Sequence, residues 1–241
     1  MINRIKYFIA KLWMLLFGGK GELKSLKSNT AIVSHGNLSP DSCKSLIDRI
    51  DTELQVAASK VVWRDECQSD HRILSFENLV PEIIHELKIP EKIKAVNKYT
   101  GRRTKSWYLM ANKIEPKPGN KGSGGGWHRD SAFSHQVKFI WYLNDVDEKN
   151  GPFQFIPGTN DVSFFENSKC LSQTRFSEVR SIPQSVEGSS GTLLVCDTKC
   201  IHRGKPVLSG VRYALTLYTF PTKRGASNNF RKLGFEALVS N

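Results

Sequence analysis

Three side chains in the second half of the sequence are of the types that bind divalent metals. His128 and Asp130 stand two positions apart, in the run His-Arg-Asp. In an extended strand, residues i and i+2 point to the same face, so this imidazole and this carboxylate are expected to converge. His202 follows much later, after a predicted strand and a turn at Asp197. A fold that places His202 opposite the pair would complete a ligand set of two imidazoles and one carboxylate.

Such a ligand set leaves metal positions open, and it is the facial triad of non-haem Fe(II) oxygenases. By itself the His-x-Asp pair is a weak sign, because pairs of this kind arise by chance and then lie at the surface. Arg212 stands ten residues after His202, inside a predicted strand. A buried guanidinium there would hold the distal carboxylate of 2-oxoglutarate through paired hydrogen bonds. Alone, Arg212 is better explained by an ion pair with an acid at the surface.

The elements that must position these residues change in character along the chain. A helix is predicted from Ser39-Pro40-Asp41 to about Gln55, and two shorter helices are predicted over 81–88 and 90–99. Later runs are short and rich in β-branched and aromatic residues, with Gly, Pro, Asn and Asp between them. These predicted strands cover 107–115, 136–144, 153–156, 191–197 and 211–220. We therefore expect a mainly β (α+β) fold with helices first and an antiparallel double-sheet jelly roll after them.

Four segments taken together resemble the Fe(II)/2-oxoglutarate-dependent dioxygenases. They are GWHRDS (126–131), IWYLNDV (140–146), NGPFQFIPGT (150–159) and CIHRG (200–204), with an arginine further on. The branch that they resemble most is the phytanoyl-CoA dioxygenase-like one, and the prolyl-hydroxylase-like branch is the second choice. The resemblance covers about residues 105–221, roughly half of the chain.

This resemblance implies a double-stranded β-helix core of the cupin-like jelly-roll kind. It implies that His128, Asp130 and His202 bind Fe(II) and that Arg212 binds 2-oxoglutarate, with O2 as the other cosubstrate. The implied reaction is hydroxylation of a substrate C–H bond. Halogenating relatives have lost the carboxylate ligand, so the presence of Asp130 favours oxygen insertion.

One position departs from the family pattern. Members often carry a hydroxyl residue two positions after the arginine, where this chain has Ala214. We therefore expect a different side chain to make the second hydrogen bond to the oxoacid. Asn112 is ranked first, ahead of Tyr108 and Thr216, and Lys138 on the neighbouring predicted strand is a further candidate.

The first 28 residues differ from the rest and are expected to form an arm. They carry six basic residues against Glu22 alone, which is +5 of the formal net charge of +12. Their apolar stretch is far shorter than the ~20 residues that a membrane-spanning helix needs. The expected division is an arm over 1–28 and one dioxygenase domain over 29–241, with a helical part at about 39–104 and a jelly-roll core at about 105–221.

On a helical wheel the apolar residues of the arm share one broad face. They are Ile5, Phe8, Ile9, Leu12, Trp13, Leu15 and Leu16. A basic amphipathic helix of this kind suits the plane of a membrane interface. Packing of the apolar face on the same domain or on a second subunit is equally compatible, and a secretory signal peptide is a third alternative.

The net charge of +12 indicates an anionic partner. Residues 88–105 contain seven basic side chains but few aromatic ones for base stacking, so nucleic acid is the less favoured partner. The five cysteines form no disulfide framework, and Cys196 and Cys200 lack a fourth ligand for zinc, which indicates reduced thiols. We expect a cytoplasmic enzyme, peripheral on the inner face of a membrane, with a small-molecule or lipid-linked substrate. A non-catalytic binding module and a nucleic-acid-modifying oxygenase are the alternatives, and the oligomeric state is left open.

Overall fold

The computed structural model describes residues 2–56, 60–130, 136–161, 182–235 and 238. Its strands are β1 (Ala31–Ser34), β2 (Val62–Arg64), β3 (Asp70–Leu74), β4 (Ser106–Ile114), β5 (Val137–Tyr142), β6 (Phe153–Phe155), β7 (Gln184–Val186), β8 (Leu193–Asp197), β9 (His202–Gly204) and β10 (Arg212–Phe220). Its helices are α1 (Ile2–Phe17), η1 (Glu22–Ser25), α2 (Leu26–Asn29), α3 (Pro40–Leu54), η2 (Phe76–Asn78), α4 (Ile83–Glu86), α5 (Ile89–Thr100), η3 (Thr159–Asp161) and α7 (Gly225–Lys232).

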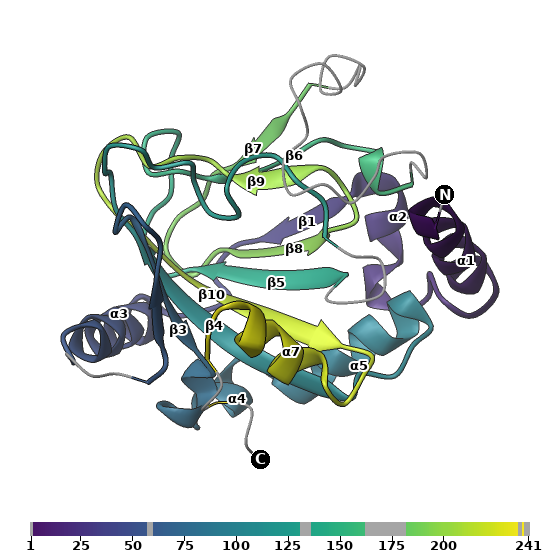
Figure 1. Cartoon of the computed structure of the whole chain (residues 1–241), viewed down its shortest axis with the longest axis horizontal. Helices are drawn as coiled ribbons and strands as arrows, with labels where there is room; N and C mark the ends of the chain where they lie inside the picture. The colour runs from purple at the N-terminus through teal and green to yellow at the C-terminus, as the bar shows by residue number, and fades with distance from the viewer. Residues whose placement is uncertain (1, 57–59, 131–135, 162–181, 236–237, 239–241) are drawn as a thin grey trace.

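Two antiparallel sheets face each other, one large and one small (Figure 1). The large sheet has seven strands in the order β1-β8-β5-β10-β4-β3-β2, and the small sheet has three in the order β7-β6-β9. Helices α3, α4 and α5 lie on the side of the large sheet that faces away from the small one. The expected mainly β fold with a double-sheet jelly-roll core is therefore confirmed.

The two faces of the large sheet differ in chemistry because side chains alternate along each strand. One face packs against the helices and is apolar, with Leu109, Phe139, Trp141, Leu215 and Leu217 in the main core. The other face points toward the small sheet. Across four neighbouring strands it carries Arg72, Asn112, Ala214 and Tyr142 at paired positions. The space between the sheets is thus lined in part by polar and charged side chains.

Helices α3 and α5 begin and end close to the residues that the sequence indicates. Ser39 caps α3, because its hydroxyl accepts the backbone N–H of Ser42 at 3.1 Å, and Pro40 occupies the first turn. Helix α5 ends before Gly101, which has the left-handed φ of 68°. The helix predicted over 81–88 is shorter than expected, since α4 covers only four residues.

Three strands of the large sheet were missed in the sequence. The expectation that residues 39–104 are helical and that the sheet begins near 105 is wrong, because β2 and β3 lie in that segment and β3 pairs with β4. Strand β1 also precedes that segment, where it pairs with β8. Strand β3 carries Asp70 and Arg72 on its inward face, so the usual pattern of apolar inside and polar outside is inverted there. Helix α2 crosses the expected boundary at residue 28.

A buried carboxyl between η2 and β4 makes stability depend on pH. Oε2 of Glu77 accepts the backbone N–H of Leu109 at 2.8 Å, and burial raises the pKa of Glu77 to about 7 from 4.5. The folded chain therefore keeps a proton that the unfolded chain releases above about pH 4.5, so the free energy of unfolding falls as pH rises toward 7. Relative to Glu77→Gln, the wild type is expected to lose about 2 kcal/mol between pH 5 and pH 8. Urea unfolding of both proteins at the two pH values measures this, and parallel changes in the two would contradict it.

Among the described residues, no helix combines the length and the apolar character needed to cross a bilayer.

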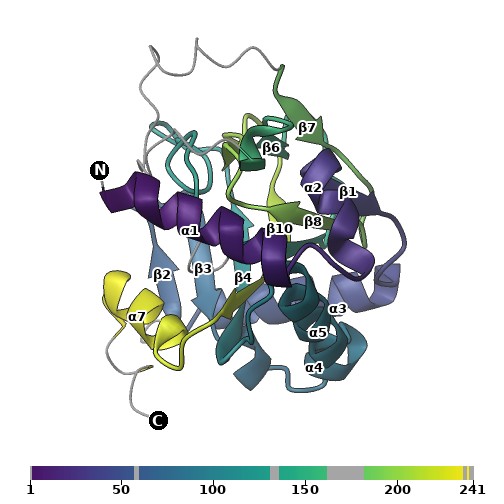
Figure 2. The same cartoon turned by 90° about the vertical axis from the view of Figure 1, so that its right-hand side faces the viewer.

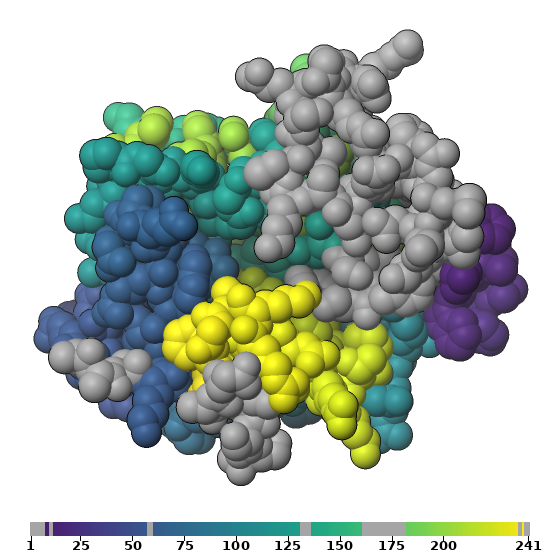
Figure 3. All heavy atoms as spheres, viewed as in Figure 1, coloured from purple at the N-terminus to yellow at the C-terminus, as the bar shows by residue number. Residues whose placement is uncertain are grey.

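Helix α7 packs against β4, where the ring centroid of Phe230 lies 4.8 Å from that of Tyr108. In the space-filling view its segment lies at the surface beside the segment that contains β2 and β3 (Figure 3).

Candidate metal centre

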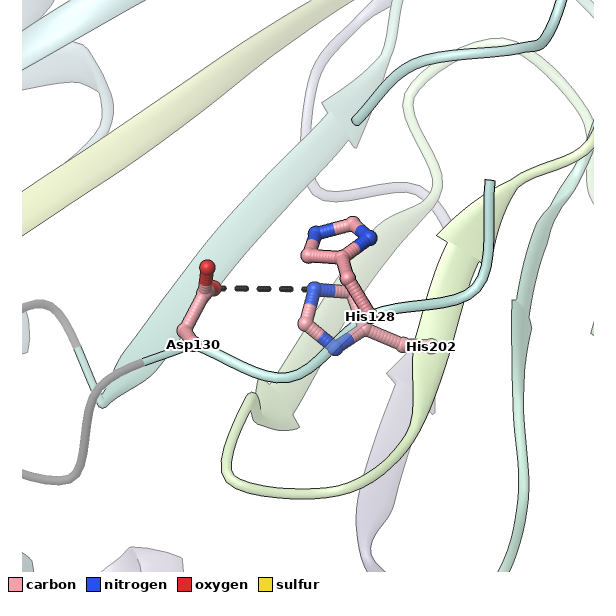
Figure 4. A group of neighbouring side chains, drawn as sticks. All are labelled: His128, Asp130 and His202. Atoms are coloured by element: carbon pink, nitrogen blue, oxygen red, sulfur yellow. Dashed lines mark ion pairs between the residues drawn. The ribbon is translucent and has the colours of Figure 1, made fainter. Parts of the chain in front are cut away.

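His128, Asp130 and His202 meet between the two sheets, and one ligand atom from each lies within 4.8 Å of the others (Figure 4). His202 opens β9 and forms an isolated antiparallel bridge with His128, in which each backbone N–H donates to the other carbonyl at 2.9 Å. The backbone N–H of Asp130 donates to the carbonyl of Thr198, also at 2.9 Å. The residues that the sequence singled out for their spacing are thus brought together by backbone pairing on both sides.

Both imidazoles are held in the tautomer that a metal needs. Nδ1 of His128 lies 2.8 Å from the carbonyl oxygen of Gly126, and Nδ1 of His202 lies 3.0 Å from that of Cys200. A carbonyl only accepts, so each Nδ1 carries the proton and each Nε2 presents a lone pair. Such outer contacts orient metal-binding histidines in proteins generally.

The buried Nε2 of His202 shows that the residues fit a metal ion. Within the described part of the chain this atom has no hydrogen-bond partner, and it lies 3.5 Å from Oδ2 of Asp130. Burial, together with the charge that His128 would carry, holds the pKa of His202 well below its usual range, so the ring is neutral. An unpaired buried nitrogen is costly, and a metal that also binds Asp130 would satisfy it. Two imidazoles and one carboxylate match the donor set of Fe(II) oxygenases.

Lys138 of β5 reaches the same carboxylate. Its Nζ lies 2.7 Å from Oδ2 of Asp130 and 5.0 Å from the ring centroid of Tyr218. Burial acts to lower the pKa of Lys138, but the charge of Asp130, the nearby phenol of Tyr218 and the hydrogen bond to Asp130 together outweigh it, so the pKa lies above its ordinary value. We expected this lysine as a contact for the oxoacid, and the structure places it against the candidate metal ligand.

Arg212 is the buried first residue of β10. Its Nη1 donates to the carbonyl of Gly151, whereas its buried Nε has no hydrogen-bond partner among the described residues. Its Nη2 lies close to Gly204, because a Cβ added at that glycine would stand 3.0 Å away. His202 is the first residue of β9 and Gly204 is the last. The guanidinium of Arg212 therefore lies near the end of β9 that is opposite to His202. Burial lowers the pKa of Arg212, but a guanidinium keeps its charge in a protein.

The side chains proposed as second oxoacid contacts have different surroundings. Asn112 is buried on the inward face of β4, opposite Ala214. Thr216 is buried on the same face, one pleat further along β10. The hydroxyl of Tyr108 instead accepts from the side-chain amide of Asn229, beneath α7. The place of Asn112 as the preferred contact stays a prediction.

The sequence reasoning missed Arg72 of β3. Its Nε and Nη2 donate to Oδ2 of Asp70 at 3.0 and 2.5 Å, and Nη2 also donates to the hydroxyl of Ser123 at 3.3 Å. The guanidinium lies 4.7 Å over the ring of Trp63. Arg72 therefore links β3, which lies next to the edge strand of the large sheet, to the glycine-rich loop over 120–126 that precedes His128. Its role depends on the register of a strand that carries no clear sequence pattern.

That glycine-rich loop also carries a close contact that the sequence analysis passed over. Gly124 has a φ of 89°, and a Cβ there would overlap the imidazole of His128. At Gly122, with a φ of 77°, a Cβ would overlap the carbonyl oxygen of Gly204. The only sequence signal was the run of glycines directly before a candidate ligand.

Cys196 and Cys200 are buried free thiols with their sulfur atoms 3.6 Å apart, in keeping with the prediction of reduced cysteines. Cys170, which that prediction also covered, lies outside the described residues.

Comparisons with known proteins bear on the same residues. A family model described as phytanoyl-CoA dioxygenase matches residues 29–213. The L-proline trans-4-hydroxylase of Streptomyces griseoviridis is 30% identical over 70 residues, which are 25% of this chain and 26% of that enzyme. The match therefore spans about a quarter of that relative's length.

Several solved structures share the fold. The carbocyclase SnoK of nogalamycin biosynthesis has a TM-score of 0.61 at 14% identity, over 82% of each chain. EctD of S. alaskensis with bound Fe has 0.59 at 16%, over 84% of this chain and 78% of that one. HygX of Streptomyces hygroscopicus with nickel and 2-oxoglutarate has 0.57 at 14%, over 83% and 86%. At such identities these structures support the fold alone.

The family model covers well over half of the chain, including all three triad residues and Arg212. The resemblance noted in the sequence is thereby confirmed, for the superfamily and for the branch. The chain belongs to the phytanoyl-CoA dioxygenase family, within the Fe(II)- and 2-oxoglutarate-dependent oxygenases.

Proposed function

We propose that this protein is an Fe(II)- and 2-oxoglutarate-dependent oxygenase that hydroxylates a C–H bond of its substrate. The observation that carries the proposal is the convergence of His128, Asp130 and His202, with both imidazoles held in the metal-binding tautomer. An intact carboxylate at Asp130 supports oxygen insertion as the outcome. The buried guanidinium of Arg212 on the facing sheet supports an oxoacid as the cosubstrate.

When bound, Fe(II) supplies the activation of O2 that is coupled to decarboxylation of 2-oxoglutarate to succinate. The residues of the chain would bind the ion and hold 2-oxoglutarate in place. The two Nε2 atoms and the Asp130 carboxylate hold the ion, and the carbonyls of Gly126 and Cys200 keep both rings in place. In this proposal Arg212 binds the distal carboxylate of 2-oxoglutarate, and Asn112 donates a further hydrogen bond to it.

An anaerobic titration of metal-free protein with Fe(II) and 2-oxoglutarate tests the proposal. A visible charge-transfer band is expected when the oxoacid chelates the bound ion, and His128→Ala is expected to lose the band. Succinate formed after O2 is admitted would exclude the alternative of a binding module without turnover. Folded wild-type protein that shows neither band nor succinate would overturn the proposal.

Arg212→Met is expected to weaken 2-oxoglutarate binding while Fe(II) binding persists. Loss of a charge-assisted pair of hydrogen bonds costs about 1.5–3 kcal/mol, which is about 10- to 150-fold in the dissociation constant. The titration above measures this shift along the 2-oxoglutarate axis. Arg103→Met, at an exposed arginine, serves as the control and should leave the titration unchanged. Equal titrations for the two variants would remove Arg212 from the site.

We also propose that the substrate is a small molecule or lipid-linked saccharide reached at an anionic membrane face, by an enzyme that is peripheral on the cytoplasmic side. The net charge of +12 and the basic amphipathic segment support this. Salt-sensitive binding of single-stranded oligonucleotides would instead favour the nucleic-acid alternative.

A further inference from the structure

Helix α1 presents its apolar side to solvent. Seven of the eleven exposed large hydrophobic side chains in the described part of the chain belong to this helix. We call them the α1 face; they are Phe8, Ile9, Leu12, Trp13, Leu15, Leu16 and Phe17, and they are 43–71% exposed. Figure 3 shows the helix projecting at one side of the molecule. An exposed apolar surface of this extent marks an interaction site in a folded protein.

The opposite side of α1 is fixed to the body of the protein. Met14 is buried, and its sulfur accepts from Nζ of Lys199 at 3.6 Å and from Nε2 of Gln136 at 3.8 Å. In the C-terminal part of the helix, Nε1 of Trp13 donates to the carbonyl of Gly101 at 3.0 Å. Trp13 and Phe17 thus lie beside Gly101, but all seven side chains are at least 43% exposed. The described part of the domain therefore does not cover the α1 face, contrary to the alternative that this face packs on it.

Lysines from two distant parts of the sequence lie beside this helix. Lys20, Lys24 and Lys27 are exposed in the segment that follows α1. Exposed Lys98 of α5 packs along the same segment, because a Cβ added at Gly21 would lie 3.2 Å from its Cδ. Figure 2 shows α1 lying across this side of the molecule with α2 and α5 next to it. The basic arm and part of the basic run over 88–105 therefore form one surface.

We propose that the α1 face, together with Lys20, Lys24, Lys27 and Lys98, is a docking surface for an anionic lipid bilayer. Exposed Trp, Phe and Leu side chains on a helix too short to span suit insertion in the plane of the interface. The neighbouring lysines complement anionic headgroups, which attract basic side chains close to such a surface. A second copy of the chain on the same face would bring its own lysines against these four, so charge disfavours that occupant.

The docking helix lies close to the metal centre. Met14 contacts Lys199, whose backbone carbonyl accepts from Nε of Arg129. The neighbouring carbonyl of Thr198 accepts from the backbone N–H of Asp130. A bilayer on the α1 face would therefore be separated from the segment that carries Asp130 by helix α1 and residues 198–199. This position suits a lipid or lipid-linked substrate, and that part of the inference rests on the proposed function.

Sedimentation with vesicles tests the docking surface without any use of activity. The full chain is mixed with vesicles of phosphatidylcholine alone or with about 30% phosphatidylglycerol added. Phe8→Asp/Leu15→Asp changes the two most exposed side chains of the face, and Leu208→Asp is a matched control at 66% exposure outside it. We expect wild type and Leu208→Asp to sediment with the anionic vesicles and the double variant to bind at least about tenfold more weakly.

Three results would overturn the inference. They are equal binding by the double variant, equal binding of wild type to neutral vesicles, and a wild-type dimer in analytical ultracentrifugation that the double variant abolishes without any vesicle binding. If the double variant does not fold, Lys20→Glu/Lys24→Glu/Lys27→Glu takes its place, with the same expected loss. The Fe(II)/2-oxoglutarate band reports folding of each variant. Its absence from the wild type would overturn the oxygenase proposal and leave the vesicle result standing.

Discussion

Replacing His202 with alanine is expected to abolish succinate formation and to weaken Fe(II) binding by more than about 100-fold. Loss of an outer partner of a metal ligand costs about 10–100-fold in affinity, and loss of the ligand itself costs more. His202 is 2% exposed, and its buried Nε2 has no hydrogen-bond partner among the residues that the structure describes. Equilibrium dialysis of iron, with succinate measured in parallel, checks the result.

His85→Ala is the control, since His85 is exposed on α4 and takes no part in the site. Retention of wild-type iron stoichiometry by His202→Ala would contradict the assignment of the triad. Asp130→Ala is a poorer probe, because it would leave Lys138 buried without the carboxylate that lies 2.7 Å from it. A buried charge that loses its partner costs about 3–5 kcal/mol, so that variant would mix loss of the ligand with loss of stability.

The second large effect is expected at Gly124, which touches no cosubstrate in the proposal. In Gly124→Ala the new methyl group would overlap the ring of His128, so the imidazole must leave its position. Displacement of a ligand by about 1 Å is enough to lose the site, and we expect Fe(II) affinity to fall by about 10–100-fold. The same iron dialysis measures the change.

Gly125→Ala is a matched control in the same loop. Gly125 has a φ of 74°, close to the 89° of Gly124, but no atom of the described residues lies within 4 Å of a Cβ added there. Both variants should lose about 1–2 kcal/mol of stability from the left-handed backbone, and only Gly124→Ala should lose iron. An equal loss of iron in the two would mean that backbone strain, and not the overlap with His128, controls the site.

The sequence predicts some of these residues more directly than others, for physical reasons. The spacing of His128 and Asp130 is local, so the convergence of their side chains follows from backbone geometry alone. His202 and Arg212 needed the ordered motifs of a family, because nothing local relates a residue in β9 to one some seventy positions earlier. The strands β4, β5, β8 and β10 were found because they contain runs of β-branched and aromatic residues.

Arg72 and the packing of Gly124 could not be found in this way. The place of Arg72 depends on the pairing of β3 with β4, and β3 has charged residues where a strand usually buries apolar ones. The role of Gly124 depends on how closely a loop approaches one ring, which no composition records. The orientation of α1 shows the same limit. The sequence predicts an amphipathic helix there, but it does not determine which side of the helix packs on the protein.

The ion pair between Lys138 and Asp130 bears on how the enzyme matures. The charge of Lys138 balances that of the Asp130 carboxylate, so assembly of the sheets does not bury an unpaired carboxylate at the ligand set. Small zinc domains differ, because their ligands are brought together only by the ion and the chain stays unfolded without it. We therefore expect folding and iron loading to be separable steps in this protein. Newly made protein should accumulate in a native, iron-responsive form when iron is scarce and become competent when iron returns, without passing through the unfolded chain again.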